Sequence, residues 1–288
     1  MTMDYAQLKS CGFLKQVQDE RYSLRLKVVG GQVSAEQLNS VYKLANKFGN
    51  GYVHLTSRQS IEVPFIKQED IEQVQAFLAQ EKLEVASTGP KVRTITACQG
   101  KAVCQSGLID TSSLAREFDE RFGGRPVPHK FKLGITGCRN NCLKAEENDI
   151  GIKGALVPTW SSESCTYCGL CQKICPNQAI LVESKPKSLT YDKAKCVNCG
   201  KCVKKCPQHS WDGESCFIVT FGGLYGNRIV IGQQLLPIIR SKEQLFTVIE
   251  TALVFFEEHG NKGERFCTML DRIGWNALTE RLKQVIEE

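Results

Sequence analysis

The runs CTYCGLCQKICP (165–176) and CVNCGKCVKKCP (196–207) each place four cysteines at the spacing C-x2-C-x2-C-x3-C and end in proline. Thiolates are soft, anionic ligands, and four of them can hold one [4Fe–4S] cluster. Zinc sites usually join two C-x2-C halves across a longer loop, so two dense runs favour iron–sulfur clusters over zinc. The runs are also the only convincing internal repeat, because Cys196 follows Cys165 by 31 positions.

The order of the cysteines also predicts how the two runs share their ligands. In bacterial two-cluster proteins the fourth cysteine of each run ligates the other cluster. One predicted cluster therefore uses Cys165, Cys168, Cys171 and Cys206, and the other uses Cys196, Cys199, Cys202 and Cys175. Crossed ligands hold two clusters close together, as one-electron relay requires. Strand-like segments flank this stretch, so we expect 162–209 to be a bacterial-type ferredoxin module inserted into a larger domain.

Composition excludes several functional classes. The chain has 288 residues and fifteen cysteines, with 42% hydrophobic and 24% charged residues, as in globular proteins. No apolar run reaches the roughly 18 residues of a membrane span. No basic start followed by an apolar run opens the sequence, and metal-type cysteine spacings fit a reducing cytoplasm. The formal charge of +6 comes from scattered lysines and arginines, which favours a site for a small anion or polycarboxylate cofactor over nucleic acid.

Hydrophobic periodicity predicts an α+β fold. Strand-like alternation over 24–31 and 51–66 is interleaved with helical spacing over 34–48 and 68–83. The first helix has Ser34 as its cap and an apolar series of Leu38, Val41, Leu44, Ala45 and Phe48. A second α+β unit follows, with strands expected at 92–98, 130–138 and 216–223 and a helix near 111–122. The segment 245–256 is expected to be a buried helix.

Four more cysteines form the pairs C-x5-C at 98–104 and C-x3-C at 138–142. These spacings alone leave structural thiols or a zinc site open. Their surroundings, ITACQGKAVC (95–104) and KFKLGITGCRNNC (130–142), resemble siroheme-containing sulfite and nitrite reductases. The resemblance extends over nearly the whole chain, through LRLKVVGG (24–31), HLTSRQSIEV (54–63), FGGLYG (221–226) and DRIGW (271–275). By size and layout it is nearest to small dissimilatory-type or anaerobic sulfite reductase catalytic subunits with an inserted ferredoxin domain.

The resemblance implies one sulfite-reductase-like repeat. Residues 1–85 would form a ferredoxin-like α+β domain, and residues 86–161 with 210–288 would form the siroheme and [4Fe–4S] domain. The ferredoxin module at 162–209 would interrupt the second domain. The implied third [4Fe–4S] cluster is held by Cys98, Cys104, Cys138 and Cys142, with Cys142 also bridging to the siroheme iron. The expected cofactors are therefore siroheme and three [4Fe–4S] clusters.

Several cations match functional positions of the family. Arg93, Lys130 and Lys132 resemble the cations that bind substrate and siroheme, and Arg58 resembles an arginine that contacts the cofactor. Lys27 stands where the family commonly has an arginine, so a compact ammonium group replaces a planar guanidinium group at this position. Lys130 and Lys132 are two apart on an expected strand, so both should face one side. A solvated strand edge is the alternative interpretation of this pair.

The predicted activity is six-electron reduction of sulfite to sulfide. Nitrite reduction to ammonia is the enzymatic alternative, and a non-catalytic electron-transfer or redox-sensing subunit is the other class. No G-x-G-x-x-G dinucleotide motif follows a strand, so an external donor such as ferredoxin or a reductase subunit is expected. Larger family members carry two repeats and this chain has one, which predicts a homodimer or higher oligomer. Cys11, Cys216 and Cys267 lack partner spacings and are expected to be ordinary buried residues.

Overall fold

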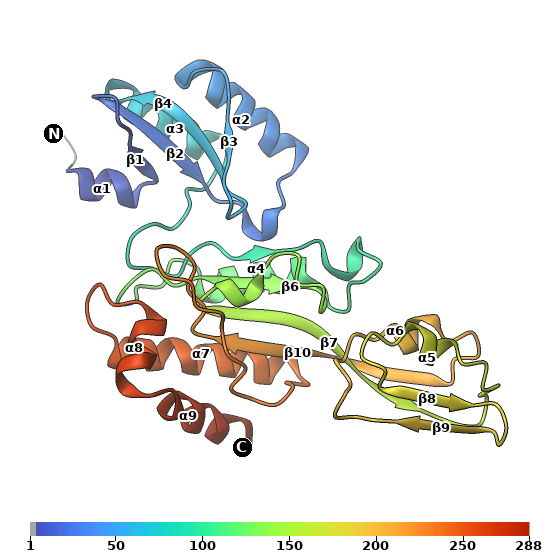
Figure 1. Cartoon of the computed structure of the whole chain (residues 1–288). Helices are drawn as coiled ribbons and strands as arrows, with labels where there is room; N and C mark the ends of the chain where they lie inside the picture. Colours follow the sequence, from blue (N-terminus) through green and yellow to red (C-terminus); the bar gives the residue numbers. More distant parts are fainter. Residues whose placement is uncertain (1–3, 288) are drawn as a thin grey trace.

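Two four-stranded sheets, each with its own helices, form the body of the computed structural model (Figure 1), which describes residues 4–287. Residues 1–3 and 288, at the ends of the predicted first and second domains, lie outside this range. The elements of the first sheet unit are α1 (Tyr5–Ser10), β1 (Phe13–Lys15), β2 (Arg21–Leu26), η1 (Val29–Gly31), α2 (Ala35–Phe48), β3 (His54–Leu55), β4 (Ile61–Lys67), η2 (Gln68–Asp70) and α3 (Ile71–Gln80).

The first sheet is antiparallel throughout, with the order β1-β2-β4-β3. Helix α2 begins with a capping box in which the Ser34 hydroxyl accepts from the Gln37 amide and the Gln37 side chain accepts from Ser34. Its apolar face packs on the sheet through Val41, Leu44 and Phe48 in one core. Leu38 does not belong to that core, because its side chain is exposed.

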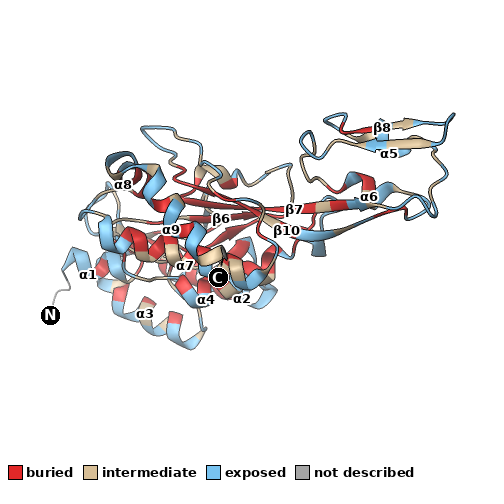
Figure 2. Ribbon diagram, turned by 90° about the horizontal axis from the view of Figure 1, so that it is seen from below, coloured by how far each residue is buried: buried red, intermediate tan, exposed pale blue. Residues whose placement is uncertain are grey.

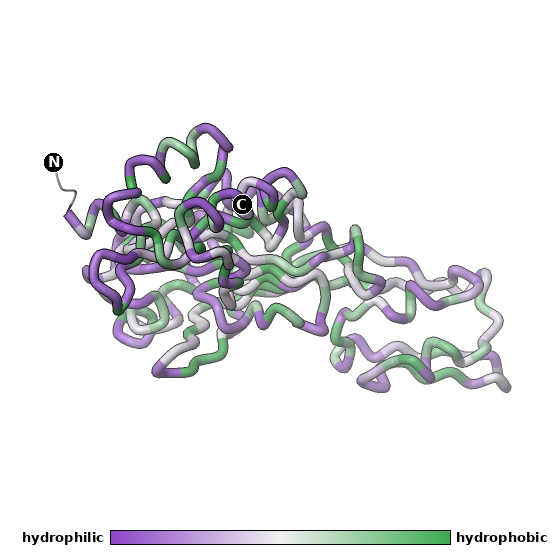
Figure 3. Tube along the Cα trace, turned by 90° about the horizontal axis from the view of Figure 1, so that it is seen from above, coloured by the Kyte–Doolittle hydropathy of each residue, from purple (hydrophilic) through white to green (hydrophobic). Residues whose placement is uncertain are grey.

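The second unit has a mixed sheet of order β10-β7-β6-β5, in which β5, β6 and β7 are parallel and β10 is antiparallel to β7. Its elements are β5 (Thr96–Ala97), η3 (Gly100–Ala102), α4 (Thr111–Phe122), β6 (Leu133–Thr136), η4 (Ala145–Glu147), β7 (Ile150–Trp160), β10 (Trp211–Phe221), α7 (Lys242–His259), α8 (Phe266–Ile273) and α9 (Trp275–Glu287). Figure 3 shows apolar residues concentrated along these central strands, which with α4 and α7 bury one continuous core.

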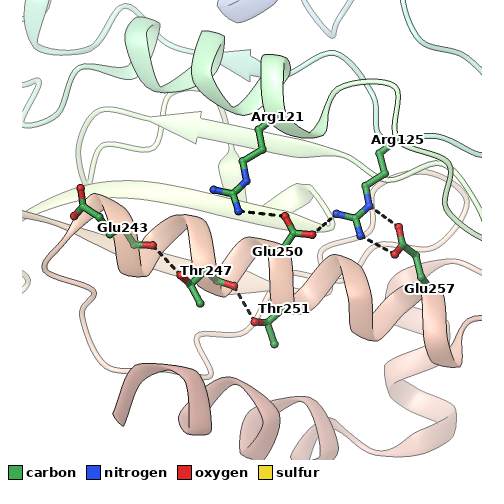
Figure 4. A network of polar contacts seen from close by, with 7 residues as sticks. All are labelled: Arg121, Arg125, Glu243, Thr247, Glu250, Thr251 and Glu257. Carbon is green, nitrogen blue, oxygen red and sulfur yellow. Dashed lines mark hydrogen bonds and ion pairs between the residues drawn. The ribbon is translucent and has the colours of Figure 1, made fainter. Parts of the chain in front are cut away.

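Helices α4 and α7 lie side by side in this unit. The rings of Phe118 and Phe246 pack with centroids 4.4 Å apart. At the end of α4, Arg125 forms a two-pronged ion pair with Glu257, with bonds of 2.6 and 2.7 Å, and also contacts Glu250 (Figure 4). A planar guanidinium matches a carboxylate in this geometry, so the pairing fixes the angle between the two helices.

Residues 161–210 leave the second sheet between β7 and β10, whose long antiparallel ribbon runs from Ile150 opposite Phe221 to Trp160 opposite Trp211. The segment contains α5 (Leu170–Ile174), β8 (Ile180–Glu183), β9 (Ser188–Tyr191) and α6 (Lys201–Lys205). Figures 1 and 2 show it projecting from the body with most of its surface exposed. The β8–β9 hairpin and the two short helices give it a separate small core that includes Ile180 and Trp211.

The sequence pattern was wrong over 51–66. The expected strand is a hairpin, because β3 pairs with β4 and residues 56–60 form the turn between them. The strand expected at 92–98 is regular only over β5, and that expected at 130–138 only over β6. The predicted helices at 34–48 and 111–122 are confirmed. Within residues 4–287, no helix is long and apolar enough to cross a membrane.

Candidate active site

The two sheet units meet at the β3–β4 turn, which presents Arg58 and Gln59 to the second sheet. The Gln59 side chain donates to the Ala97 carbonyl at 2.8 Å and accepts from the Ala97 amide at 3.0 Å. A side-chain amide thus completes the hydrogen bonding of the free edge of β5. Gly30 (φ 61°) packs on the same edge, where a Cβ atom would meet Ala115 at 3.2 Å. The glycine turn and Gln59 therefore fix the first unit directly beside β5.

Arg58 is half-buried at this junction. Its two terminal nitrogens donate to the Asn148 side chain at 2.8 Å and to the Thr94 carbonyl at 3.0 Å. The pKa of Arg58 is lowered to about 10, chiefly by burial, with the neighbouring Arg93 and Arg25 acting in the same direction and Asp149 opposing them. Arg58 remains charged at neutral pH and supplies fixed positive potential to this part of the molecule.

A cavity of about 250 Å³ opens beside Arg58. It collects four of the predicted cations, which come from both sheet units, and adds one arginine that sequence reasoning missed. These cations are Arg25, Arg58, Arg93, Lys130 and Lys132. None of the described residues that line it carries a carboxylate, although Arg25 donates to Glu62 at 2.6 Å from outside the lining. A concentration of like charge around a small cavity is unfavourable unless an anion occupies it.

Lys130 and Lys132 lie just before β6, where Phe131 forms a single bridge with Val92. The backbone is extended there, so the two lysines face the same cavity although neither belongs to the regular strand. The pKa of Lys132 is lowered to about 8, chiefly by burial, with the nearby Arg58 and Arg265 acting in the same direction. Burial also lowers the pKa of Lys130, with Arg265 and Arg93 acting in the same direction.

Arg93 and Arg265 keep unpaired donors in this region. Arg93 donates from one terminal nitrogen to the Ser87 carbonyl at 2.9 Å, and Arg265 pairs with the fully buried Asp149 at 3.0 Å. The Nε atoms of both arginines are buried without a partner among residues 4–287. Asp149 also accepts from the Lys132 amide at 2.8 Å. Unsatisfied buried donors in a cationic cavity are the features expected of a site for an oxyanion or carboxylate group.

Lys27 does not line this cavity. Its ammonium lies 2.7 Å from Asp119 and 2.9 Å from Glu84, and the lysine borders a different cavity near the start of α2. Both carboxylates favour its charged form, and its pKa is raised even though burial opposes the change. The predicted role of Lys27 in anion binding is therefore not supported by this geometry. Arg25, two residues earlier on β2, occupies the cavity instead.

The cysteine pairs 98/104 and 138/142 gather at the end of β5 and β6 that lies away from the cation cavity. Cys98 and Cys138 follow the carboxyl ends of these parallel strands, and Cys104 and Cys142 follow in the next loops. The Cys98 sulfur accepts from the Gly137 amide at 3.0 Å. Burial raises the pKa of Cys138, and the neighbouring thiols of Cys104, Cys98 and Cys142 raise it further, while a backbone amide opposes them. The strands therefore connect a cation cavity at one end with four thiols at the other.

The inserted segment brings the crossed cysteine sets together. One cavity is lined by Cys165, Cys168, Cys171 and Cys206. The hydroxyl of Tyr191 lies among Cys196, Cys202 and Cys175; burial raises the Tyr191 pKa, as do these thiols. The pKa of Cys202 is raised to about 12, chiefly by burial, with the neighbouring thiols of Cys196 and Cys199 acting in the same direction.

The backbone repeats along with the cysteines. Left-handed residues recur 31 positions apart at Tyr167 and Asn198 and again at Gly169 and Gly200. The amides four residues after Cys175 and Cys206 each donate to the cysteine sulfur at 3.3 Å. Hydrogen bonds to sulfur favour the thiolate, which is the form that binds iron.

The chemistry of these residues fits the predicted cofactors. All fifteen cysteines are free thiols, and Cys216 and Cys267 are buried outside the three sets while Cys11 is half-buried. Within residues 4–287, no three metal-binding side chains converge tightly enough for a single ion. A four-iron cluster is larger than one ion and holds its thiolates further apart. Five cations around one cavity, with the Arg93 Nε donor unpaired, fit a polycarboxylate macrocycle and an oxyanion substrate.

Comparison with known proteins gives the chain a family. The model described as "Nitrite and sulphite reductase 4Fe-4S domain" matches residues 88–288, and the "Nitrite/Sulfite reductase ferredoxin-like half domain" matches residues 14–81. A "Coenzyme F420-dependent sulfite reductase" of Methanocaldococcus jannaschii is 33% identical over 94% of this chain, which spans 43% of that relative. The protein MJ0551 of the same organism is 34% identical, with 92% of each chain covered.

Other relatives match over part of their length. One subunit of the anaerobic sulfite reductase of Salmonella typhimurium is 33% identical over 54% of this chain and 50% of its own. The crystal structure of "dissimilatory sulfite reductase I" superposes with a TM-score of 0.72 at 19% identity, covering 91% of this chain and 69% of the other. The NirA protein of Mycobacterium tuberculosis gives 0.68 at 14% identity, over 99% and 48%.

The predicted α+β fold and the predicted family are thereby confirmed. The match to the ferredoxin-like half domain covers the sheet unit that carries Arg58, and the match to the 4Fe-4S domain covers the strands that precede the cysteine pairs. The chain belongs to the nitrite and sulphite reductase family of oxidoreductases.

Proposed function

We propose that this chain is a siroheme-dependent sulfite reductase that reduces sulfite to sulfide. The observation that carries the proposal is the pairing of a cation cavity with four thiols at opposite ends of β5 and β6. Sulfite takes up six electrons and seven protons to give hydrosulfide and three waters. An enzyme for this reaction needs a place to hold an oxyanion, a supply of protons and a route for electrons, and each can be assigned to residues of this chain.

The third cluster would be held by Cys98, Cys104, Cys138 and Cys142, and Cys142 would also be the residue that couples it to siroheme. Siroheme, when bound, supplies the iron at which sulfite is reduced. The sulfur of Cys98 accepts from the Gly137 amide, which stabilises its anionic form. The thiolates follow two short parallel strands, either directly or in the next loops, and the Gln59 contact fixes the position of β5.

The cations bind and orient the substrate in this proposal. Arg93, Lys130 and Lys132 would hold the sulfite oxygens, and Arg58 would contact the carboxylates of the cofactor. Lys132 is the proposed proton donor, because burial and neighbouring arginines lower its pKa to about 8. Arg93 and Arg58 cannot act in this way at neutral pH, so they supply charge alone.

The inserted segment at 162–209 is proposed as a ferredoxin module with two clusters. The set containing Cys196 and Cys199 lies nearer the catalytic unit, because Cys199 bridges to Leu156 of β7. The ammonium of Lys204 in α6 donates to the carbonyls of Gln105 at 2.9 Å and Gly107 at 2.7 Å, next to Cys104. Together with the catalytic cluster this gives three [4Fe–4S] clusters, and free thiols in this number suit a cytoplasmic protein.

The chain spans about half or less of the named sulfite reductases that it matches, so its assembly is part of the proposal. A single repeat would need walls from a second copy to enclose the cofactor, and a twofold dimer is the simplest arrangement. Light scattering on the siroheme-loaded protein should give at least twice the 32.1 kDa chain mass. An active, fully loaded particle at 32.1 kDa contradicts the dimer.

Activity is tested by assaying sulfite and nitrite side by side on anaerobically purified protein with reduced methyl viologen as donor. The proposal predicts faster turnover of sulfite and release of sulfide. The "Nitrite reductase (NADH) large subunit" of Escherichia coli is 30% identical over 49% of this chain, so nitrite is the second candidate substrate. Faster nitrite turnover selects that alternative, and a chain with clusters but no turnover of either anion is an electron-transfer subunit.

A further inference from the structure

Positive charge is concentrated in the inserted segment. Residues 162–209 contain eight lysines and three acidic residues, a formal charge of +5, whereas the other 240 residues contain 29 basic and 28 acidic residues. All eight lysines are exposed. A solvated surface usually interleaves charges of both signs, as the rest of this chain does. The segment therefore carries almost the entire net charge of the protein on one projecting module (Figure 1).

Part of this charge lies around the cysteine set that contains Cys165 and Cys206. We call it the outer cysteine set, because it lies further from the second sheet unit than the set with Cys196 and Cys199. Lys173 lies in α5 between two of the cysteines, and Lys185 and Lys187 lie in the turn between β8 and β9. That hairpin contributes Val182 and Leu189 to the lining of the cysteine cavity. We call Lys173, Lys185 and Lys187 the lysine rim.

The rim is available to a partner. None of its three ammonium groups forms an ion pair within the described part of the chain, whereas Lys195 pairs with Asp192 and Lys204 is bound to the catalytic unit. Next to the rim, Cys168 and Leu170 are exposed at the mouth of the cysteine cavity. A charged border around a small exposed apolar and thiol surface is the composition of a transient docking site.

We propose that the lysine rim docks an acidic one-electron donor protein onto the outer cysteine set. The inference rests on the proposed function, in which Cys165, Cys168, Cys171 and Cys206 hold a cluster. Each docking event oxidises the donor by one electron and reduces the outer cluster by one, so six events serve one sulfite. Opposite charge on the two partners accelerates their encounter by about 10- to 10³-fold and lets them separate quickly afterwards.

The test uses the variant Lys185→Glu/Lys187→Glu in the cluster-loaded protein. Both residues lie in an exposed turn, so the fold and the iron content should be unchanged. The matched control Lys15→Glu/Lys262→Glu makes the same charge change at exposed lysines of the body. Adding Lys173→Glu gives a stronger variant, and Lys185→Arg/Lys187→Arg should behave as the unmodified protein because it keeps the charge.

The probe is an acidic [2Fe–2S] ferredoxin, and its binding is measured by calorimetry at low and physiological salt. The unmodified protein and the control should bind it with an affinity that falls as salt is added. The rim variant should bind at least about 10-fold more weakly at low salt and lose most of the salt dependence. Equal binding by the rim variant and the control overturns the docking proposal.

Reduction by methyl viologen, a small cation that needs no rim, separates this proposal from the proposed function. Stopped-flow bleaching of the clusters by viologen should proceed at the same rate in all variants, while bleaching by the reduced ferredoxin slows at least about 10-fold in the rim variant alone. Protein that contains no iron in this segment refutes the cluster assignment itself. Normal viologen bleaching with unchanged ferredoxin bleaching refutes only the rim.

Discussion

Replacing Lys132 with methionine removes one positive charge from the cation cavity and keeps a side chain of similar length. At pH 7 a lysine of pKa about 8 is about nine-tenths protonated, so nearly a full charge is lost. A unit charge about 4 Å from an anionic oxygen contributes about 4 kcal/mol at an effective dielectric of about 20. Lys132 is half-buried and four cations remain, so we expect a loss nearer 2.7 kcal/mol, or about 10²-fold in sulfite turnover.

The pH dependence distinguishes a lost charge from a damaged fold. Turnover of the unmodified enzyme should fall as pH rises past 8 or somewhat above, because Lys132 loses its proton and a bound anion raises its pKa. Lys132→Met should lack this limb, and Lys132→Arg should move it to higher pH. Since burial lowers this pKa, the unfolded chain binds more protons between about pH 8 and the ordinary lysine value, and the residue's contribution to stability rises with pH there. Lys132→Met should therefore be at least as stable as the unmodified protein at pH 7.

The assay is steady-state sulfite reduction with reduced methyl viologen on protein matched for siroheme absorbance. Lys130→Met should show a loss of similar size, since Lys130 borders the same cavity. Lys262→Met, at an exposed position of the body, is the control for the same change in net charge. Unchanged turnover in both Lys130→Met and Lys132→Met refutes the assignment of the anion site to this cavity.

Three other predictions address the clusters, Lys27 and the electron donor. Cys138→Ser should lower the iron content from about twelve to about eight atoms per chain and abolish siroheme absorption, whereas Cys216→Ser should change neither. Lys27→Met should lower the free energy of unfolding by about 1–3 kcal/mol in urea titrations, because the buried Asp119 carboxylate loses its partner. Its sulfite turnover should stay within about threefold of the unmodified enzyme. A loss of about 10²-fold in turnover with unchanged stability would place Lys27 in the anion site after all. NADH or NADPH alone should support no sulfite reduction by the isolated chain, and rapid turnover with either contradicts the requirement for a donor protein.

Local patterns account for most of the fold that the sequence predicts. Helical spacing and the Ser34 cap give α2, and the α+β fold class that the resemblance implied is confirmed by the family matches. Alternation predicts one strand over 51–66 because the pattern continues through the β3–β4 turn. The two strands are separated by hydrogen bonds between Thr56 and Ser60 and by the contacts of Gln59 with β5. Leu38 has the right helical spacing for the core, yet its side chain is exposed in the folded chain.

In the candidate site, too, some residues could be predicted from the sequence and others could not. Arg58, Arg93, Lys130 and Lys132 come together in one cavity, as the resemblance implied, although their binding roles stay predictions. Arg25 was missed because it is one of two cations on the same strand segment, and the sequence alone does not tell which of them faces the cavity. The structure separates them, since Asp119 and Glu84 engage Lys27.

Arg265 and Asp149 lie 116 positions apart in sequence and form their buried pair only in the folded chain. A signal for such pairs exists in neither periodicity nor motif spacing, because each residue by itself resembles an ordinary surface charge. The same holds for Lys204, whose contact with Gln105 crosses from the inserted segment to the loop that carries Cys104. Long-range polar contacts of this kind hold the site together and are visible only in three dimensions.

The central claim is that one chain holds siroheme coupled to a [4Fe–4S] cluster together with two further clusters. Iron and labile-sulfide analysis of anaerobically purified protein, combined with its visible absorption spectrum, tests it most directly. The predicted result is about twelve non-haem irons per chain, from the ligand count of twelve cysteines, together with the absorption bands of siroheme. About eight irons with no siroheme band would contradict the claim, because the two clusters of the inserted segment would then be present without the catalytic centre.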